Sequence, residues 1–371
     1  MSQSSSASCC DSGHLEFSDE SDLQTYQVAD GIPLPFGFIV DRWRLIATLG
    51  RGGFSCCYLA EDQQQTHLPL VALKIGGILG SKDEHDWSWT NFHQELHMFR
   101  RLCVGDSGLH ATCVPQIFGW GILESTDGQR PWICMERLGQ DLYSETWYIA
   151  KERHELEGLD RQAARWPGKG YSEPCLLQYA LVMLRALQHV HRQNIVHRDV
   201  KPANFCLPHS GELVGKRRDQ PASKVYLIDF GLSHDVPLKE GHEPFFGTPD
   251  YASSACLHEK KAFPKDDLES LVYTLLEMWN GELPWDLEAD IDIKGNEDEL
   301  HGWTSQQLRD MSKARQRRWD KLLLQDLLPP WILWLDRYIK ALSSIDPVSY
   351  EYCAMMLNAF REIQDPHDPE E

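Results

Sequence analysis

HRDVKPANF, residues 197–205, brings a carboxylate, an ammonium group and an amide within a few positions of one another: Asp199, Lys201 and Asn204. Directly before it, residues 176–194 carry apolar side chains at helical spacing, which predicts a long amphipathic helix leading into this polar stretch. Taken alone, Asp199 could cap a helix and Lys201 could be an ordinary surface charge. The chemistry of the stretch therefore depends on the motifs around it.

Two motifs lie upstream. LGRGGFSCCY (49–58) predicts a Gly-rich turn between strand-like runs, where glycines allow backbone N–H groups to approach phosphate oxygens, although a plain hairpin would explain the turn equally well. VALK (71–74) places Lys74 inside an apolar strand, and a buried ammonium group needs an anionic partner. Glu95, in the helical segment 87–103, is the natural candidate.

One motif lies downstream. IDFG (228–231) sets Asp229 at the end of a short apolar strand, where a simple turn residue would account for it alone. The four motifs together, in this order, match the signature set of protein kinases. The segment GTPDYASSACLHEKKAFPKDDLESLVYTLLEMWNGELPW (247–285) resembles the casein kinase 1 family more closely, with the tau-tubulin and vaccinia-related kinases as relatives. MERLG (135–139) at the hinge is similar to the same family, and the likeness covers about residues 42–363.

The order of elements predicts the fold class. Strand-type runs come first, and PWICMERLG (131–139) predicts a buried strand that runs into a turn. Beyond Pro264 the chain is helical to about Ile363, interrupted by a polar stretch at 286–303. This order predicts an α+β chain with a small β-rich N-lobe and a larger α-helical C-lobe, and the resemblance implies the bilobal protein-kinase fold. We expect a disordered Ser-rich and acidic arm at 1–30, a kinase domain at 31–364 and an acidic tail at 365–371. Within the domain, the N-lobe would span about 42–135 and the C-lobe about 139–364. Insertions at 144–171 and 207–224 would form solvated loops or, in the first, a lengthened surface helix.

The resemblance implies ATP and Mg²⁺ as cofactors and protein Ser/Thr hydroxyls as acceptors. Asp199 would accept the proton of the attacking hydroxyl, and Lys201 would lie against the γ-phosphate, as in Ser/Thr kinases. Lys74, held by Glu95, would bind the α- and β-phosphates. The metal ligands would be Asp229 for one Mg²⁺ and Asn204 for a second.

The remaining nucleotide contacts are also implied by the resemblance. Cys57 and Ala72 would cover the adenine, Cys206 would form the floor of the pocket, and Met135 would be the gatekeeper. The full set of expected nucleotide-binding positions, besides Lys74, is Leu49, Gly50, Arg51, Gly52, Gly53, Phe54, Ser55, Cys56, Cys57, Ala72, Met135, Glu136, Leu138, Cys206 and Ile228. Ser55 stands where the third glycine of the loop is usual, which could slow turnover. Cys56 and Cys57 could be sensitive to oxidation, but inert packing thiols are the simpler interpretation.

The expected activation segment is 229–253. Its stretch HDVPLKEGHEPFFG (234–247) contains no Ser, Thr or Tyr, so it offers no hydroxyl for phosphorylation. Glu240 or Glu243 could instead present a carboxylate to Arg198, and we predict a kinase that needs no activation-loop phosphate. Casein kinase 1 enzymes prefer acidic or primed sites, read by an Arg where this chain has Asp250. The reversed charge predicts a preference for neutral or basic sites.

Composition excludes several classes of protein. The formal charge of −20 argues against nucleic-acid binding, and no apolar run approaches the about 20 residues of a membrane span. Because a secretory signal is absent and the 11 cysteines have no regular CxxC spacing, we expect reduced thiols and a protein that is not secreted. We expect it in the cytoplasm, the nucleus or both. We also expect it to act as a monomer. The basic run KARQRR (313–318) could be a nuclear-import patch or the solvent face of a helix.

Two rival functions remain open. A pseudokinase scaffold would bind ATP or partners with little turnover, but it would not need all of Lys74, Glu95, Asp199, Asn204 and Asp229. A kinase of small molecules is disfavoured by the peptide-docking stretch GTPDYASSA.

Overall fold

A computed structural model of the chain describes residues 34–52, 55–65, 70–78, 87–104, 113–125, 128–157, 170–209, 221–287 and 303–364. The predicted arm (1–30) and acidic tail (365–371) lie outside these residues, as do parts of both predicted insertions, 158–169 and 210–220. The described part of the first insertion is a helix, α2 (Leu142–Glu157), which agrees with the lengthened surface helix predicted there. Among the helices that the structure describes, none is long and apolar enough to cross a bilayer.

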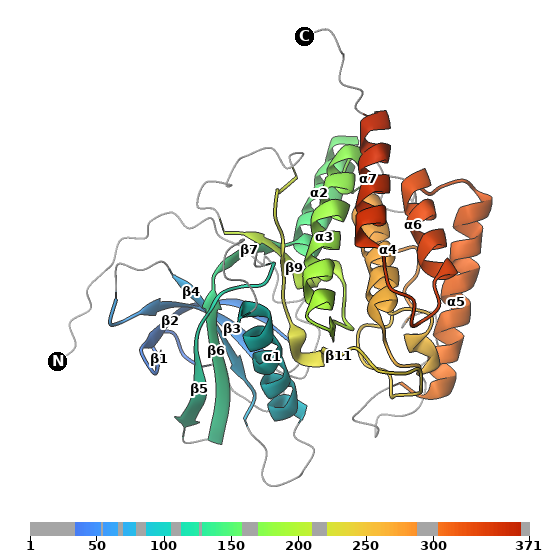
Figure 1. Cartoon of the computed structure of the whole chain (residues 1–371). Coiled ribbons are helices and arrows are strands. Elements are labelled where there is room, and N and C mark those ends of the chain that lie inside the picture. The colour runs from blue at the N-terminus through green and yellow to red at the C-terminus, as the bar shows by residue number, and fades with distance from the viewer. Residues whose placement is uncertain are drawn as a thin grey trace, which may run out of the picture.

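The N-terminal lobe is built on one antiparallel sheet with the strand order β1-β2-β3-β4-β6-β5. Its strands are β1 (Ile39–Val40), β2 (Trp43–Arg51), β3 (Ser55–Asp62), β4 (Val71–Gly76), β5 (Ile117–Ser125) and β6 (Gly128–Glu136). Helix α1 (Trp87–Val104) lies against the sheet (Figure 1). Because successive strand residues face opposite sides, Trp43, Leu73 and Trp132 fill an apolar core on one face of the sheet, while Ala72 and Ile133 belong to the core that includes α1.

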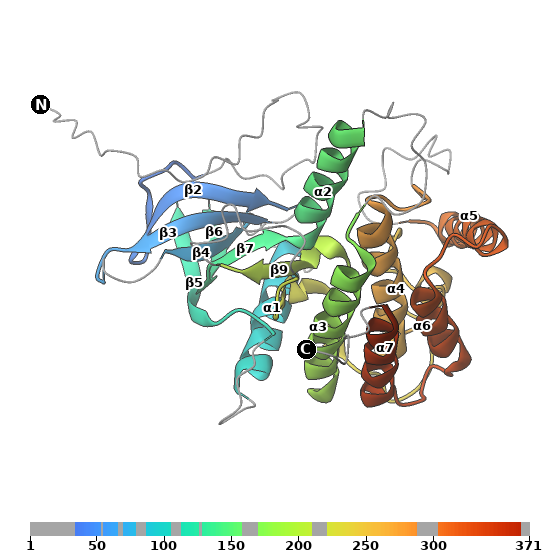
Figure 2. The same cartoon turned by 90° about the horizontal axis from the view of Figure 1, so that it is seen from above.

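The C-terminal lobe is helical, and Figures 1 and 2 show its helices gathered on the side of the molecule away from the sheet. Besides α2, they are α3 (Glu173–Arg192), α4 (Pro264–Asn280), α5 (Ser305–Leu324), α6 (Pro330–Ala341) and α7 (Tyr350–Gln364). Helix α4 is buried almost all round, as expected for the central helix of a bundle, and packs against α3 and α6. Its first turn is capped by Asp266, whose Oδ2 accepts the backbone N–H of Phe263 at 2.8 Å.

Two small sheets flank the stretch HRDVKPANF, since β8 ends just before it and β9 begins at its last residue. We expected the buried strand at 131–139 to run into a turn. That prediction was wrong, because after the single residue Arg137 the chain enters another strand, β7 (Leu138–Asp141). This strand pairs with β9 (Phe205–Pro208), which pairs in turn with β10 (Tyr226–Leu227). β8 (Ile195–Val196) pairs with β11 (His234–Asp235) and ties the chain before HRDVKPANF to the start of the activation segment.

The bilobal α+β architecture predicted from the order of elements is therefore confirmed. The predicted helix at 176–194 corresponds to α3, and its apolar face is buried: Leu177, Leu181, Leu184 and Leu187 are each at most 2% exposed. Burying a leucine side chain of this kind contributes roughly 1.5–3 kcal/mol, so this face fixes α3 firmly beneath the polar stretch that follows it.

Candidate active site

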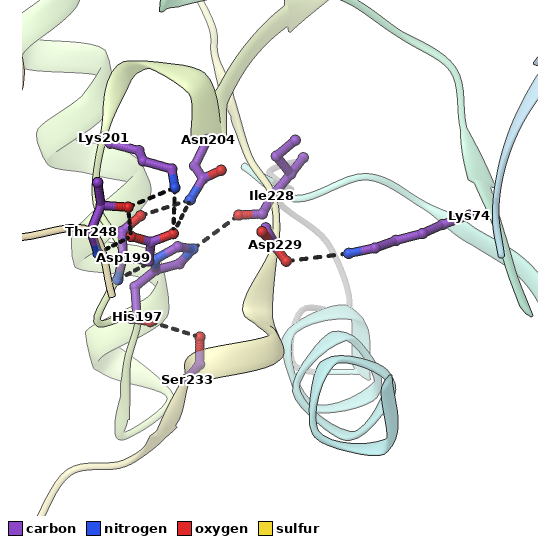
Figure 3. Close-up of polar contacts among 9 residues, drawn as sticks. All are labelled: Lys74, His197, Asp199, Lys201, Asn204, Ile228, Asp229, Ser233 and Thr248. Carbon is purple, nitrogen blue, oxygen red and sulfur yellow. Dashed lines mark hydrogen bonds and ion pairs between the residues drawn. The ribbon is translucent and has the colours of Figure 1, made fainter. Parts of the chain in front are cut away.

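The carboxylate of Asp199 lies at the centre of a cluster of polar side chains from two separate segments (Figure 3). Its Oδ1 accepts the backbone N–H of Thr248 at 3.0 Å and the Thr248 hydroxyl at 2.8 Å. Its Oδ2 lies 2.8 Å from Lys201 Nζ and 3.2 Å from Asn204 Nδ2. Lys201 Nζ also donates to the Thr248 hydroxyl at 2.8 Å, so both oxygens of Asp199 are held in place.

The backbone of this segment is held in an unusual conformation. Arg198 has φ = 72°, a left-handed value that costs a non-glycine residue of order 1–3 kcal/mol. Asp267, in α4, stabilises it by accepting the backbone N–H groups of His197 at 2.7 Å and Arg198 at 2.9 Å. Burial acts to raise the pKa of Asp267, but hydrogen bonds from His191 and the neighbouring donors outweigh it and hold that pKa below its usual value.

Asp267 was not among the predicted site residues. The stretch KDDLESL that contains it was recognised only as a family likeness. No local pattern showed that this carboxylate would meet a backbone segment some 70 positions earlier in the chain.

Three charged groups meet on the other side of the cleft. Lys74 Nζ, on β4, lies 2.8 Å from both carboxylate oxygens of Glu95 on α1 and 3.2 Å from Asp229 Oδ1. The predicted ion pair between Lys74 and Glu95 is thus present. Burial acts to lower the pKa of Lys74, but the charges of Asp229 and Glu95 outweigh it and raise that pKa. Burial raises the pKa of Glu95. The two 2.8 Å contacts are nonetheless those of an ionised carboxylate with an ammonium group, so both side chains are charged.

Asp229 has the features of a cation ligand. Its pKa is lowered chiefly by the charge of Lys74, and 48% of its side chain is exposed, so the carboxylate remains ionised and accessible. It too has a left-handed backbone, with φ = 64°. Among the described residues, no group of three His, Cys, Asp or Glu side chains forms an all-protein metal site. A single carboxylate with the nearby Asn204 amide still fits Mg²⁺, which usually takes one or two protein ligands together with substrate phosphates.

His197 connects the two sides of the cleft. Its Nε2 lies 2.9 Å from the carbonyl oxygen of Ile228, the residue before Asp229, and its own carbonyl accepts the Ser233 hydroxyl at 3.2 Å (Figure 3). The backbone that carries Asp199 and the backbone that carries Asp229 are therefore fastened to each other.

The expected adenine-binding residues come from four strands of the two lobes. Cys57 on β3 pairs with Lys74 on β4, and Ala72 on β4 pairs with Leu59 on β3. Met135 lies near the end of β6, and Cys206 lies on β9. Burial raises the pKa of Cys57 to about 12 and also raises that of Cys206. Thiols of this kind are neutral at pH 7, which favours the interpretation of inert packing over reactivity.

Other expected nucleotide contacts lie around the same cleft. Leu49, Gly50 and Arg51 are on β2, Ser55 and Cys56 on β3, and Glu136 and Leu138 at the junction of β6 and β7, while Ile228 precedes Asp229 and Gly52 follows β2. Gly53 and Phe54 lie outside the described residues. The Glu136 carboxylate accepts the Tyr226 hydroxyl at 2.9 Å, which ties the junction to β10, the strand paired with β9.

The activation segment is held by a carboxylate. Glu243 lies 3.5 Å from an Arg198 guanidinium nitrogen and 3.3 Å from His234 Nε2, and it accepts the backbone N–H of Ala262 at 3.1 Å. Burial acts to raise the pKa of Glu243, but His234 and Arg198 outweigh it and lower that pKa. Of the two predicted partners of Arg198, Glu243 is the one in contact, whereas Glu240 is exposed.

Asp250 has an internal role. Its carboxylate accepts the backbone N–H of Leu287 at 2.9 Å, and its carbonyl oxygen accepts the Trp285 indole N–H at 3.1 Å. The residue predicted to face substrates thus also anchors the segment that follows α4.

Comparison with known proteins shows the family to which the chain belongs. The protein kinase domain family matches residues 43–329. Similar curated proteins include serine/threonine-protein kinase C of Synechocystis sp., 26% identical over 267 residues (69% of this chain, 42% of that protein), and serine/threonine-protein kinase VRK2 of Homo sapiens, 26% identical over 281 residues (69% and 47%). Casein kinase I homolog 2 of Schizosaccharomyces pombe is 32% identical over 128 residues (32% and 28%). The chain spans less than half the length of each of these three relatives.

Proposed function

This chain belongs to the protein kinase family, and from that premise we propose that it is a Ser/Thr protein kinase that transfers the γ-phosphate of ATP to protein hydroxyls. The observation that carries the proposal is the cluster around Asp199, which faces the ion pairs of Lys74 with Glu95 and Asp229. The proposed domain is the one predicted from the sequence, residues 31–364.

In the proposed reaction the acceptor oxygen attacks the γ-phosphorus, the bond to the β-phosphate oxygen breaks, and ADP leaves. Asp199 orients the hydroxyl and takes its proton. Lys201, between Asp199 and Thr248, supplies positive charge beside the transferred group, and Lys74 binds the α- and β-phosphates. Mg²⁺, when bound, neutralises phosphate charge, and Asp229 and Asn204 are the residues that would hold it.

We place the chain near the casein kinase 1 family. The likeness of residues 247–285 supports this assignment, as does the occurrence of VRK2 and a casein kinase I homologue among the similar proteins. We also propose that the enzyme is active without an activation-loop phosphate, since Glu243 already gives Arg198 the negative partner that a phosphate gives in other kinases.

Protein substrates with neutral or basic sites form part of the proposal. Asp250 stands where casein kinase 1 enzymes carry a basic residue, and Glu240 is exposed on the same segment, so the segment lacks the positive charge that reads acidic sites. The net charge of −20 also favours encounter with basic partners. A monomer is proposed as the active form.

The deciding experiment uses phosphatase-treated protein with Mg-ATP on acidic casein and on a basic protein, with Asp199→Asn as the inactive control. We expect transfer to the basic protein, reduced about a thousandfold in the variant because the proton acceptor is lost. Transfer that prefers casein would leave the kinase and refute the substrate preference. ATP binding without transfer to any substrate would support the pseudokinase scaffold instead.

A further inference from the structure

A chain of buried polar contacts connects the last helix to the segment that carries Asp199. It begins at Tyr350, the first residue of α7, whose hydroxyl meets Nδ1 of His191 on α3. The other ring nitrogen of His191, Nε2, lies 2.8 Å from Asp267 Oδ2. Asp267 in turn holds the backbone N–H groups of His197 and Arg198.

All three side chains are withdrawn from water. The side chains of His191 and Asp267 are 4% and 2% exposed, and Tyr350 is 9% exposed as a residue. Polar groups buried to this degree depend on their hydrogen-bond partners, because solvent cannot replace a lost one. Each contact in the chain therefore restricts the next.

The contacts fit a neutral His191 ring protonated on Nε2. Nε2 faces a carboxylate, which can only accept, so Nε2 carries a proton. Burial raises the pKa of Tyr350, so its hydroxyl keeps a proton that it can donate to Nδ1. With Nδ1 accepting from Tyr350 and Nε2 donating to Asp267, the neutral ring satisfies both neighbours.

The position of Asp267 matters because of the backbone it holds. Arg198 is in the left-handed region, and a strained conformation of this kind persists only where surrounding contacts over-determine it. Asp199 is the next residue. A small movement of the Asp267 carboxylate would therefore shift Asp199 relative to Lys201 and Thr248.

Helix α7 is fastened to α3 at the same point. Glu351, the residue after Tyr350, accepts from Gln188 at 2.9 Å and lies 3.3 Å from Arg192, both on α3. These outer contacts align the start of α7 with the turn of α3 that bears His191. In both figures of the whole molecule the two helices lie side by side (Figures 1 and 2).

We propose that Tyr350 is a positioning residue for phosphoryl transfer, acting through His191 and Asp267 on the backbone that carries Asp199. The inference rests on the proposed kinase function. Nothing in the four sequence motifs indicates this role, and Tyr350 lies beyond the part of the chain matched by the family, residues 43–329.

The test compares Tyr350→Phe with Tyr352→Phe in the full chain. Both changes remove one hydroxyl from the same helix, but Tyr352 is 41% exposed and does not touch His191 in the contacts above. We expect Tyr350→Phe to lower kcat about tenfold while the KM values for ATP and protein stay within about twofold, because the groups that bind substrate remain in place. Tyr352→Phe should match the wild type.

A second measurement reads the contact directly and needs no turnover. In protein labelled with ¹⁵N-histidine, the ring signals of His191 are identified by their loss in His191→Gln. We expect a neutral ring protonated on Nε2 in the wild type and in Tyr352→Phe. In Tyr350→Phe, Nε2 still faces Asp267 and keeps its proton, but the Nδ1 signal should shift because Nδ1 has lost its hydrogen-bond donor.

The outcomes separate the two proposals. If Tyr350→Phe keeps the wild-type kcat, or lowers only the melting temperature while kcat and the His191 signals stay unchanged, the positioning role is refuted. If the wild type transfers no phosphate at all, the proposed function fails, and the His191 signals alone decide the inference: a change in Tyr350→Phe supports the contact chain, and identical signals overturn it.

Discussion

Glu95 and Glu277 are two buried glutamates with different surroundings. Glu95 faces the ammonium group of Lys74. Glu277, on α4, is 6% exposed, and its carboxylate accepts the neutral hydroxyl of Tyr251 at 2.6 Å. Burial therefore raises the pKa of Glu277 to about 7, since a hydroxyl stabilises a carboxylate less than an opposite charge does.

This difference predicts a pH-dependent stability. The folded pKa of Glu277, about 7, lies above its ordinary value of 4.5, so the stability that its protonated form contributes is present below pH 4.5 and is lost as pH rises through 7. Glutamine cannot ionise. In urea unfolding, Glu277→Gln should match the wild type near pH 4.5 and exceed it above pH 7 by at most about 3 kcal/mol.

Glu282→Gln serves as the matched control, because Glu282 is exposed just beyond the same helix and should give a wild-type profile at every pH. A constant difference between Glu277→Gln and the wild type across the pH range would contradict the raised pKa.

At the scale of elements, the activation segment depends on Glu243. This carboxylate joins Arg198, His234 on β11 and the backbone before α4. We predict that Glu243→Gln lowers kcat about tenfold in unphosphorylated protein, because the neutral amide leaves the buried Arg198 without its charge partner. Steady-state kinetics on the basic substrate would measure this effect.

Glu240→Gln is the control for that experiment. It removes the same charge from the same segment at an exposed position, so its kcat should remain that of the wild type. Equal losses in the two variants would mean that the net charge of the segment matters and the contact with Arg198 does not.

The helices and strands that have a clear local pattern could be predicted from the sequence. The apolar face of α3, the buried strand β6 and the helices beyond Pro264 all follow from periodicity and composition. β7 was missed because its four residues, LGQD, show no alternation, and they become a strand only by pairing with β9 from far along the chain.

The residues of the site fall into the same two groups, those that the sequence could predict and those that it could not. The pair of Lys74 and Glu95 could be predicted because a lysine in an apolar strand demands an anion. A carboxylate partner for Arg198 was predicted from the resemblance to kinases, in which an activation-loop phosphate pairs with this arginine, and from the absence of hydroxyls in 234–247. The sequence could not predict the contacts among His191, Asp267 and Tyr350, because each residue lies in a helix where its residue type is ordinary. Only the packing of α3, α4 and α7 brings them together.

At the scale of the whole molecule, the net charge of −20 predicts a salt effect on substrate capture. Raising the ionic strength from about 0.05 to 0.3 M shortens the Debye length and should raise the KM for a basic protein severalfold, while the KM for an uncharged peptide stays nearly constant. Initial rates over this range would measure both. An equal change for the two substrates would show that long-range attraction plays no part.

The docking of α7 onto α3 has a consequence for shortened forms of the chain. A product that ended before Tyr350 would retain all four motifs and the whole family match at 43–329, so a genome survey that counts motifs would score it as a competent enzyme. Without the hydroxyl that meets His191, and without the buried Cys353 and Leu357 of α7, it would lack the support that we propose for the backbone of Asp199. Its motif count would then overstate its turnover.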